Sequence, residues 1–228
     1  ASKIVLWEWL DGDFLQQPVP VDLLQKSADL LRKIHTIPAE KHQFFKKVFI
    51  EDRALNRLSE LEKKGYTGLD LPLLRRSLTR IQKHLKKKQA HTMIHADLHQ
   101  THLLETASGE LKLIDWGDSA TGDGYDDLAA FSYFFCLTQH QEKKFLTMYL
   151  KRTPTSQEVA RLYLKKLMVL VHFSLWHLRQ GITDASLPSF QKISPLDLPS
   201  LQHWICKNGT KTHFSGNPQL SYHLGGKG

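Results

Sequence analysis

The sequence predicts a mainly α-helical fold that contains one small β-hairpin. Apolar residues recur at helical spacing over most of the chain, and two short apolar segments separated by turn residues stand near its middle. With 228 residues, of which 41% are hydrophobic, the chain is long enough to bury a core. We therefore expect one helical body that carries a single hairpin.

The predicted elements follow one another along the chain. Residues 2–12 are an apolar segment that ends in an acidic turn, which predicts a strand. Pro18 and Pro20 precede a helix that closes at His35. Helical spacing predicts six more helices, at residues 51–64, 72–88, 127–137, 141–151, 156–180 and 198–207. The tail, residues 208–228, is rich in Gly, Ser, Asn and Thr and is expected to be flexible.

The predicted hairpin occupies residues 102–114. Its first strand is residues 102–104, turn residues follow, and its second strand ends immediately before Asp115. Because the strands of a hairpin are neighbours, we expect them to bring Asp97, His102 and Asp115 close together.

Acidic side chains are concentrated in residues 93–130. This segment holds eight of the chain's 23 Asp and Glu residues and one base, Lys112, although the net charge of the chain is +8. Crowded carboxylates repel one another, and a bound divalent cation relieves that repulsion. The segment therefore predicts a metal site. Its last two acids, Asp126 and Asp127, precede an apolar run, and one of them is expected to cap a helix.

Three motifs in this segment resemble those of the aminoglycoside phosphotransferase and choline kinase family. They are H-A-D-L-H-Q-T-H at residues 95–102, I-D-W-G-D at 114–118 and G-D-G-Y-D-D-L-A at 122–129. The resemblance implies the C-terminal lobe of a protein-kinase-like (α+β) fold. It also implies ATP-dependent transfer of a phosphoryl group to a hydroxyl of an antibiotic-like, choline-like or thiamine-like molecule, with Mg²⁺.

The resemblance implies roles for individual residues. Asp97 corresponds to the family's catalytic base, and Asp115 to the Asp that holds magnesium. His102 stands where the family usually has an Asn ligand, and it is expected to hold the metal too. His99 is expected to orient Asp97 or to approach the transferred phosphate.

Other residues are expected to support the site. The ring of His95 is expected to bond backbone carbonyls beneath the loop, and Asp127 to brace the same loop. Residues 1–12 resemble the strand that links the two lobes in this family. That resemblance implies that the backbone of Glu8 and Leu10 meets the adenine edge of ATP.

The same resemblance predicts how the chain is divided. Residues 1–12 correspond to the linker, 13–207 to the helical C-lobe and 208–228 to a tail. The family's N-terminal lobe grips the ATP phosphates, but neither G-x-G-x-x-G nor G-x-x-x-x-G-K-[ST] occurs in this chain. We therefore expect the N-lobe to be missing, and this chain alone to bind ATP weakly.

Three other classes of protein compete with this interpretation. A zinc hydrolase is suggested by a cluster that lacks the H-E-x-x-H spacing, namely His91, His95, Asp97, His99 and His102. A catalytically weak or inactive kinase-like binding or scaffold protein is favoured by His102 and the missing lobe, whereas the intact Asp97 and Asp115 argue against it. A protein kinase is disfavoured because too few residues follow Asp115 for a long activation loop.

Composition bears on partners and location. The pI is 9.4, but the basic residues form scattered pairs apart from one run at 83–88, which favours a solvated surface over a nucleic-acid interface. No apolar run is long enough to span a membrane. Cys136 and Cys206 form no C-x-x-C motif, so we expect reduced thiols in a cytoplasmic protein. The oligomeric state is not predicted.

The sequence leaves the acceptor open. A net charge of +8 gives little support for the acidic face that a polycationic aminoglycoside calls for. A choline-like or thiamine-like cation calls for an aromatic cage, for which Tyr163, Phe173, Trp176 and Trp204 are candidates.

Overall fold

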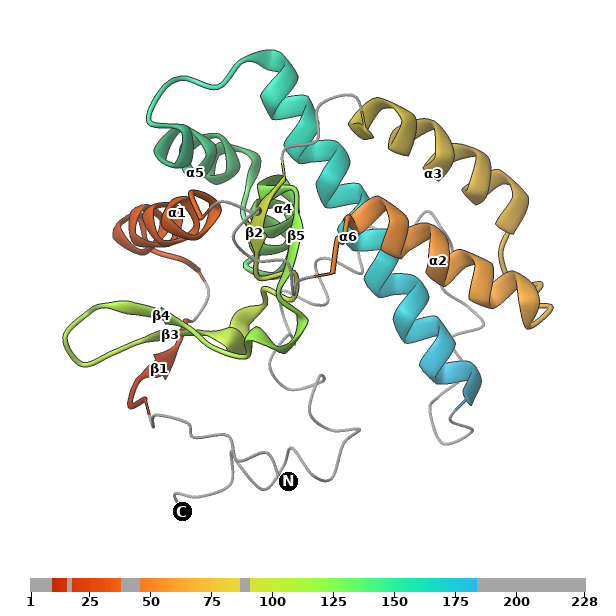
Figure 1. The fold of residues 1–228 in the computed structure, drawn as a ribbon, viewed down its shortest axis with the longest axis horizontal. Coiled ribbons are helices and arrows are strands. Elements are labelled where there is room, and N and C mark those ends of the chain that lie inside the picture. The colour runs from red at the N-terminus through yellow and green to blue at the C-terminus, as the bar shows by residue number, and fades with distance from the viewer. Residues whose placement is uncertain (1–9, 16–17, 38–45, 87–90, 184–228) are drawn as a thin grey trace.

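The computed structural model describes residues 10–15, 18–37, 46–86 and 91–183. Over these residues the fold is mainly helical, with two small antiparallel sheets (Figure 1). The mainly α-helical prediction is therefore confirmed. The predicted helix at 198–207, the tail at 208–228 and Glu8 lie outside the described residues.

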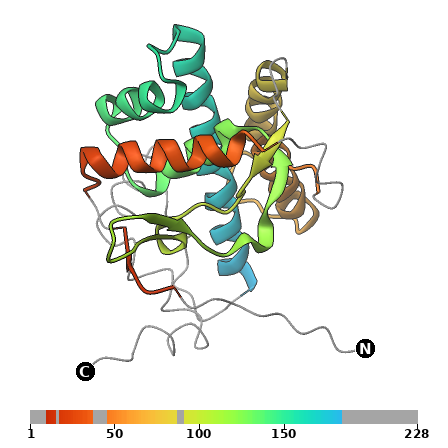
Figure 2. The same ribbon diagram turned by 60° about the vertical axis from the view of Figure 1, so that its left-hand side comes forward.

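Six α-helices make up the described body. They are α1 (Val21–His35), α2 (Ile50–Lys63), α3 (Leu71–Leu85), α4 (Gly124–Phe134), α5 (Gln139–Leu150) and α6 (Ser156–Thr183). The long helix α6 contacts α2, α3 and α4, whereas α1 packs on α5. Figure 2 shows α1 running across the direction of α6, with strands below α1. The predicted helical ranges agree with these bounds to within a few residues.

The core forms where the apolar stripes of these helices meet. On α1 the buried apolar side chains recur every three or four residues, as Leu24, Ala28 and Leu31 show. On α4 almost every residue is buried, including Leu128 and Phe131 at 0% exposure. A helix that is buried on all sides lies inside a fold, and α4 fixes the position of the loops at its N-terminus.

The strands form two small sheets instead of one hairpin. Strands β1 (Asp13–Phe14), β3 (Leu103–Glu105) and β4 (Leu111–Leu113) pair in the order β1-β3-β4, and the β3–β4 pair is the predicted hairpin. Strand β2 (Thr92–Ile94) pairs antiparallel with β5 (Ala120–Gly122). Strand β5 is not evident in the sequence, because Ala120, Thr121 and Gly122 are too small and too few to form an apolar run.

Three local predictions are corrected by the structure. Leu10 to Gly12 are not in a strand, since β1 begins only at Asp13. His102 ends a short 3-10 helix, η3 (Gln100–His102), and strand β3 starts after it. Helix α4 is capped by Asp123, whose Oδ1 accepts from the N–H of Tyr125 at 3.1 Å. Neither predicted cap, Asp126 or Asp127, fills that role, because both carboxylates are buried and bonded elsewhere.

Two findings bear on location. Within the described ranges, no helix combines the length and the apolar character that crossing a membrane requires. Cys136, just after α4, is disulfide-bonded, so the expectation that it is a reduced thiol is wrong, and Cys206 lies outside the described residues. The cytoplasmic location stays a prediction.

Candidate active site

The loop between β2 and η3 carries Asp97 and is held in a strained conformation. Ala96, immediately before Asp97, has a φ of 65°, in the left-handed region that alanine rarely adopts. Both of its backbone groups are bonded. Asp127 Oδ1 accepts from the N–H of Ala96 at 3.0 Å, and Arg53 donates to the carbonyl of Ala96 at 2.8 Å. These contacts hold the backbone of Ala96 in place, and so they set the direction in which the side chain of Asp97 projects from the loop.

Asp127 braces this loop from beneath, as predicted. Its Oδ2 accepts from the N–H of His95 at 2.8 Å and lies 3.1 Å from Nε2 of His35. Tyr149 Oη lies 2.9 Å from the other ring nitrogen of His35. Burial disfavours the charged carboxylate, but the hydrogen bonds from His35, His95 and Ala96 outweigh burial and lower the pKa of Asp127.

A glycine makes room for this buried pair. A Cβ at Gly124 would lie 2.8 Å from Nδ1 of His35, closer than such atoms approach one another. The first residue of α4 therefore has to be small if His35 is to reach Asp127.

The His/Asp cluster that suggested a zinc hydrolase is divided by the fold. His95 is buried, with Nε2 at 2.9 Å from the carbonyl of Ile114, as predicted for a supporting residue. The ring of His91 packs edge-on against Phe49, with centroids 5.6 Å apart. In the described part of the chain, only Asp97, His99 and His102 form a group of three or more possible metal ligands whose atoms all lie within 4.8 Å of one another.

His102 stands between the carboxylates of Asp97, the predicted base, and Asp115, the predicted metal ligand. Its Nδ1 lies 2.7 Å from the main-chain oxygen of Asp97, which can only accept, so Nδ1 carries the proton. Nε2 then keeps its lone pair, and it lies 3.5 Å from Oδ2 of Asp115. Nδ1 is also 3.8 Å from the Asp97 carboxylate. The structure thus brings Asp97, His102 and Asp115 together.

The Asp97 carboxylate is partly enclosed by its neighbours. Burial raises its pKa, and the nearby negative charge of Asp118 raises it further, although His102 acts in the opposite direction. Nε2 of His99 lies 3.8 Å from Asp97 Oδ2, and the His99 ring lies close to the His102 ring, with centroids 3.6 Å apart. His99 therefore borders Asp97 without a direct hydrogen bond between them.

The surroundings of Asp115 fit a metal ligand. Its backbone is left-handed (φ 59°), and its side chain is 64% exposed. Among the described residues no Lys or Arg forms an ion pair with it. Two ligands about 2.1 Å from a shared Mg²⁺ lie about 3 Å apart, so the 3.5 Å separation from His102 needs only a small adjustment. His102 and Asp115 together could hold a divalent ion.

Arg53 is a site residue that the sequence analysis missed. It lies on α2 and joins two parts of the site, because it bonds the carbonyl of Ala96 and lies 3.7 Å from the carboxylate of Asp118. These partners are 43 and 65 residues away along the chain, and no local motif marks such a contact. Leu10, whose backbone was predicted to meet adenine, is half-buried, and that role stays a prediction.

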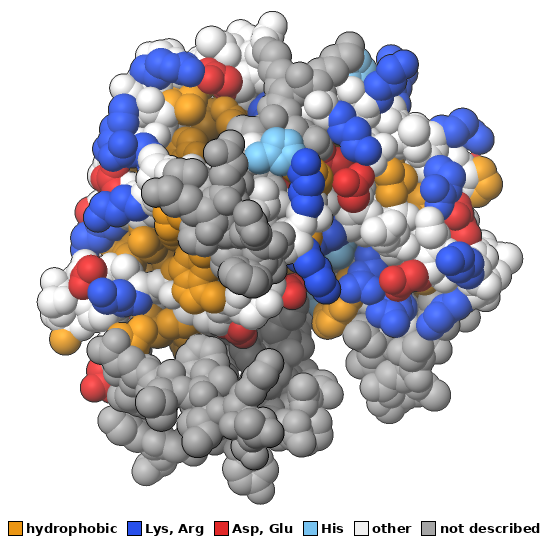
Figure 3. Space-filling view, viewed as in Figure 1, with side chains coloured by type: hydrophobic (Ala, Val, Ile, Leu, Met, Phe, Trp, Pro, Cys, Tyr) orange, Lys and Arg blue, Asp and Glu red, His pale blue; other side chains and the backbone are white. Residues whose placement is uncertain are grey.

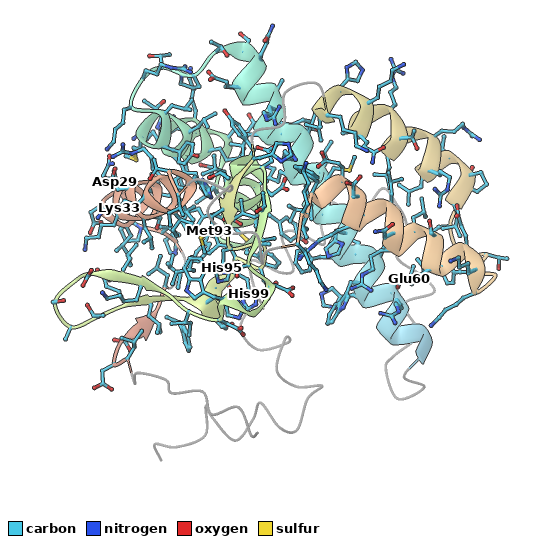
Figure 4. All side chains as sticks on the ribbon, viewed as in Figure 1. Asp29, Lys33, Glu60, Met93, His95 and His99 are labelled. Atoms are coloured by element: carbon cyan, nitrogen blue, oxygen red, sulfur yellow. The ribbon has the colours of Figure 1, made fainter. Side chains whose placement is uncertain are left out.

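The figures place the site on the molecule. In Figure 4, His95 and His99 lie close together between the β3–β4 hairpin and the helices, whereas Glu60 on α2 is remote from them.

Figure 3 shows Lys and Arg side chains dispersed among acidic ones over the face viewed, with no single basic stripe.

Comparison with known proteins defines the class to which this fold and site belong. The model of the phosphotransferase enzyme family matches residues 3–162, which is more than half of the chain. The chain therefore belongs to the phosphotransferase enzyme family. Among curated protein sequences, no significant match is found.

Solved structures of this class share the fold. Choline kinase LicA from Streptococcus pneumoniae is 20% identical, with a TM-score of 0.65, over 89% of this chain and 68% of that one. A choline/ethanolamine kinase family protein from Mesorhizobium loti is 19% identical, with a TM-score of 0.65, over 88% and 65%. The GDP complex of aminoglycoside 2'-phosphotransferase-IIIa is 16% identical, with a TM-score of 0.61, over 90% and 70%. The chain thus spans about two thirds of the length of these proteins.

Proposed function

We propose that the protein transfers the terminal phosphoryl group of ATP to a hydroxyl of a small molecule, with Mg²⁺. One observation carries the proposal. The imidazole of His102 lies 3.8 Å from the carboxylate of Asp97 and 3.5 Å from that of Asp115, in a chain of the phosphotransferase family. Because the chain spans about two thirds of the similar structures, the activity of the whole protein is a proposal.

His102 and Asp115 would hold the metal. Mg²⁺ supplies charge neutralisation on the phosphates when it is bound. The hydrogen bond from Nδ1 to the Asp97 carbonyl fixes the tautomer of His102, so its Nε2 lone pair faces the side on which Asp115 lies. Imidazole is a softer ligand than the oxygens that Mg²⁺ prefers, so Asp115 would provide most of the affinity.

Asp97 would take the proton of the acceptor. As the hydroxyl oxygen bonds to the γ-phosphorus, its proton passes to the Asp97 carboxylate, and the bond from phosphorus to the nucleoside diphosphate oxygen breaks. Burial makes this carboxylate a better proton acceptor than an exposed one. Asp127 and Arg53 would act through the backbone of the loop, which they hold in place. The backbone of Glu8 and Leu10 is proposed to meet the nucleotide base.

The experiment measures ADP release by the full-length protein with a panel of alcohols, with and without Mg²⁺. Asp97→Asn and Asp115→Ala are each expected to abolish transfer while the fold survives, whereas Asp29→Asn, on the surface of α1, leaves it unchanged. Unchanged turnover in either site variant rules out this mechanism. Tight nucleotide binding by the wild type with no ADP formed from any alcohol would instead favour a kinase-like binding protein.

A further inference from the structure

Three side chains that can bind a metal converge beside the proposed base. Asp97, His99 and His102 each offer one possible ligand atom, and these atoms all lie within 4.8 Å of one another. Oδ2 of Asp97 lies 3.8 Å from Nε2 of His99 and 3.8 Å from Nδ1 of His102. The two imidazole rings pack against each other, with centroids 3.6 Å apart. The proposed reaction uses Asp97 and His102 but gives no role to His99.

Each histidine of this cluster is oriented through one ring nitrogen. Nδ1 of His102 donates to the main-chain oxygen of Asp97 at 2.7 Å, so Nε2 keeps its lone pair. Nδ1 of His99 lies 3.0 Å from Oγ1 of Thr101, a hydroxyl that accepts as well as donates. When His99 donates to Thr101, Nε2 of His99 carries the lone pair that a metal needs. Histidines that bind a metal are typically oriented in this way through the other ring nitrogen.

The spacing of the cluster suits a tetrahedral ion. Zn²⁺ binds histidine nitrogens and carboxylate oxygens at about 2.0–2.2 Å, so two of its ligands lie about 3.4 Å apart. The 3.8 Å between Asp97 and His99 therefore needs only a small closing movement, and the ring of His102 already lies against that of His99. The side chains of His99 and Asp97 are 28% and 33% exposed, so they can move without disturbing the core.

The chemistry of the ligands favours zinc over magnesium at this cluster. Two imidazoles and one carboxylate provide more nitrogen than oxygen, whereas Mg²⁺ prefers oxygen ligands and Zn²⁺ binds histidine well. The proposed magnesium site has the opposite balance, because Asp115 supplies its main ligand. Both sites would use Nε2 of His102, which lies 3.5 Å from Oδ2 of Asp115. The two ions therefore compete for one nitrogen.

We propose that Asp97, His99 and His102 form a zinc site, which shares only His102 with the proposed magnesium site, and that Zn²⁺ bound there blocks phosphoryl transfer. The bound ion would occupy the Asp97 carboxylate, which is then unable to take the proton of an acceptor hydroxyl. Zinc binding stands on the geometry of the cluster, whereas the block rests on the proposed function. His99 distinguishes the two sites, because it belongs to the zinc site alone.

Competition between the full-length protein and a chromophoric chelator for Zn²⁺ tests the site. His99→Phe keeps an aromatic ring beside His102 but removes the ligand nitrogen, and we expect its zinc affinity to fall at least about tenfold. Thr101→Val keeps all three ligands but loses the hydrogen bond to His99, and it should weaken binding about tenfold. His140→Phe, at an exposed position of α5, is the matched control and should bind zinc as the wild type does. Wild-type affinity in His99→Phe would overturn the proposal.

Activity measurements separate the zinc site from the proposed function. Transfer with Mg²⁺ is followed as Zn²⁺ is added, and each variant is compared with its own rate before the addition. We expect Zn²⁺ to inhibit the wild type, excess Mg²⁺ to relieve the inhibition, and half-inhibition of Thr101→Val to need about tenfold more Zn²⁺. Zinc binding that depends on His99, without phosphoryl transfer to any alcohol, would support the site and refute the proposed function. Transfer that continues at an unchanged rate with Zn²⁺ bound would overturn the proposal.

Discussion

Nδ1 of His102 donates a hydrogen bond to the main-chain oxygen of Asp97 over 2.7 Å. This bond links the residue proposed to hold the metal to the residue proposed to take the proton. It also commits one ring nitrogen, so Nε2 is the nitrogen left for a metal.

Replacing His102 by Asn is expected to preserve magnesium-dependent transfer, because the amide can still donate to Asp97 and its oxygen is a harder ligand for Mg²⁺. His102→Leu removes both functions, and we expect its kcat to fall at least about a hundredfold. The dependence of turnover on Mg²⁺ concentration is the measurement. Equal activity of the Leu variant and the wild type would show that His102 holds no metal.

Lys165 is expected to be essential for folding, because its side chain is 0% exposed and lies within 3.0 Å of carboxylate oxygens of Glu51, Asp123 and Asp126. Lys165→Met leaves these buried acids without their cation and is expected to cost about 3–5 kcal/mol in the free energy of unfolding. The adjacent Lys166→Met is the control.

Lys166 pairs with one carboxylate, Glu142, and its side chain is 16% exposed, so the control should cost less than Lys165→Met, which strands three buried acids. Urea denaturation of the two variants gives both values. Similar losses for both positions would contradict the role assigned to Lys165.

Asp127→Ala is expected to lower both stability and activity. The substitution leaves the N–H groups of His95 and Ala96 and the buried ring of His35 without their acceptor. We expect a loss of about 3 kcal/mol or more in the free energy of unfolding, and kcat to fall more than the KM for the nucleotide. Asp29→Asn on the surface serves as the reference. An active Asp127→Ala enzyme with normal kcat would show that the loop holds its shape without this brace.

The pH dependence of stability is expected to report on His172. Burial lowers its pKa to about 4 in the folded protein, from about 6.5 when unfolded, so the unfolded chain binds the extra proton between these values. His172 therefore contributes stability that is present above about pH 6.5 and is lost as the pH falls towards 4, by up to about 3 kcal/mol.

His172→Phe should remove this contribution, so the difference in unfolding free energy between variant and wild type should change between pH 7 and pH 5. Because the other histidines are common to both proteins, their effects cancel in that difference. A constant difference over this range would mean that His172 titrates as an exposed histidine does.

The local part of the site could be predicted from the sequence. Asp97, His102 and Asp115 lie within 19 residues, joined by a short turn and a tight hairpin, so their order along the chain nearly determines their proximity. Helix ranges could also be predicted, because apolar periodicity reflects one buried face.

Long-range contacts could not be predicted. The apolar spacing of α6 places Tyr163 on the buried stripe, yet Tyr163 is 54% exposed and Lys165 is fully buried. Lys165 is buried because three acids meet it, one from α2, one from α4 and one that caps α4, and no pattern within α6 contains that information. Arg53 was missed for the same reason. Strand β5 was missed because its pairing with β2, rather than its own residues, makes it a strand.

Pulsed EPR of Mn²⁺ bound with ADP to the full-length protein tests the central claim most directly, because it detects nitrogen that ligates the ion. The account predicts a nitrogen coupling in the wild type that disappears in His102→Gln, and Mn²⁺ binding at least about tenfold weaker in Asp115→Asn. A coupling that persists in His102→Gln, or Mn²⁺ affinity that is unchanged in Asp115→Asn, would contradict it.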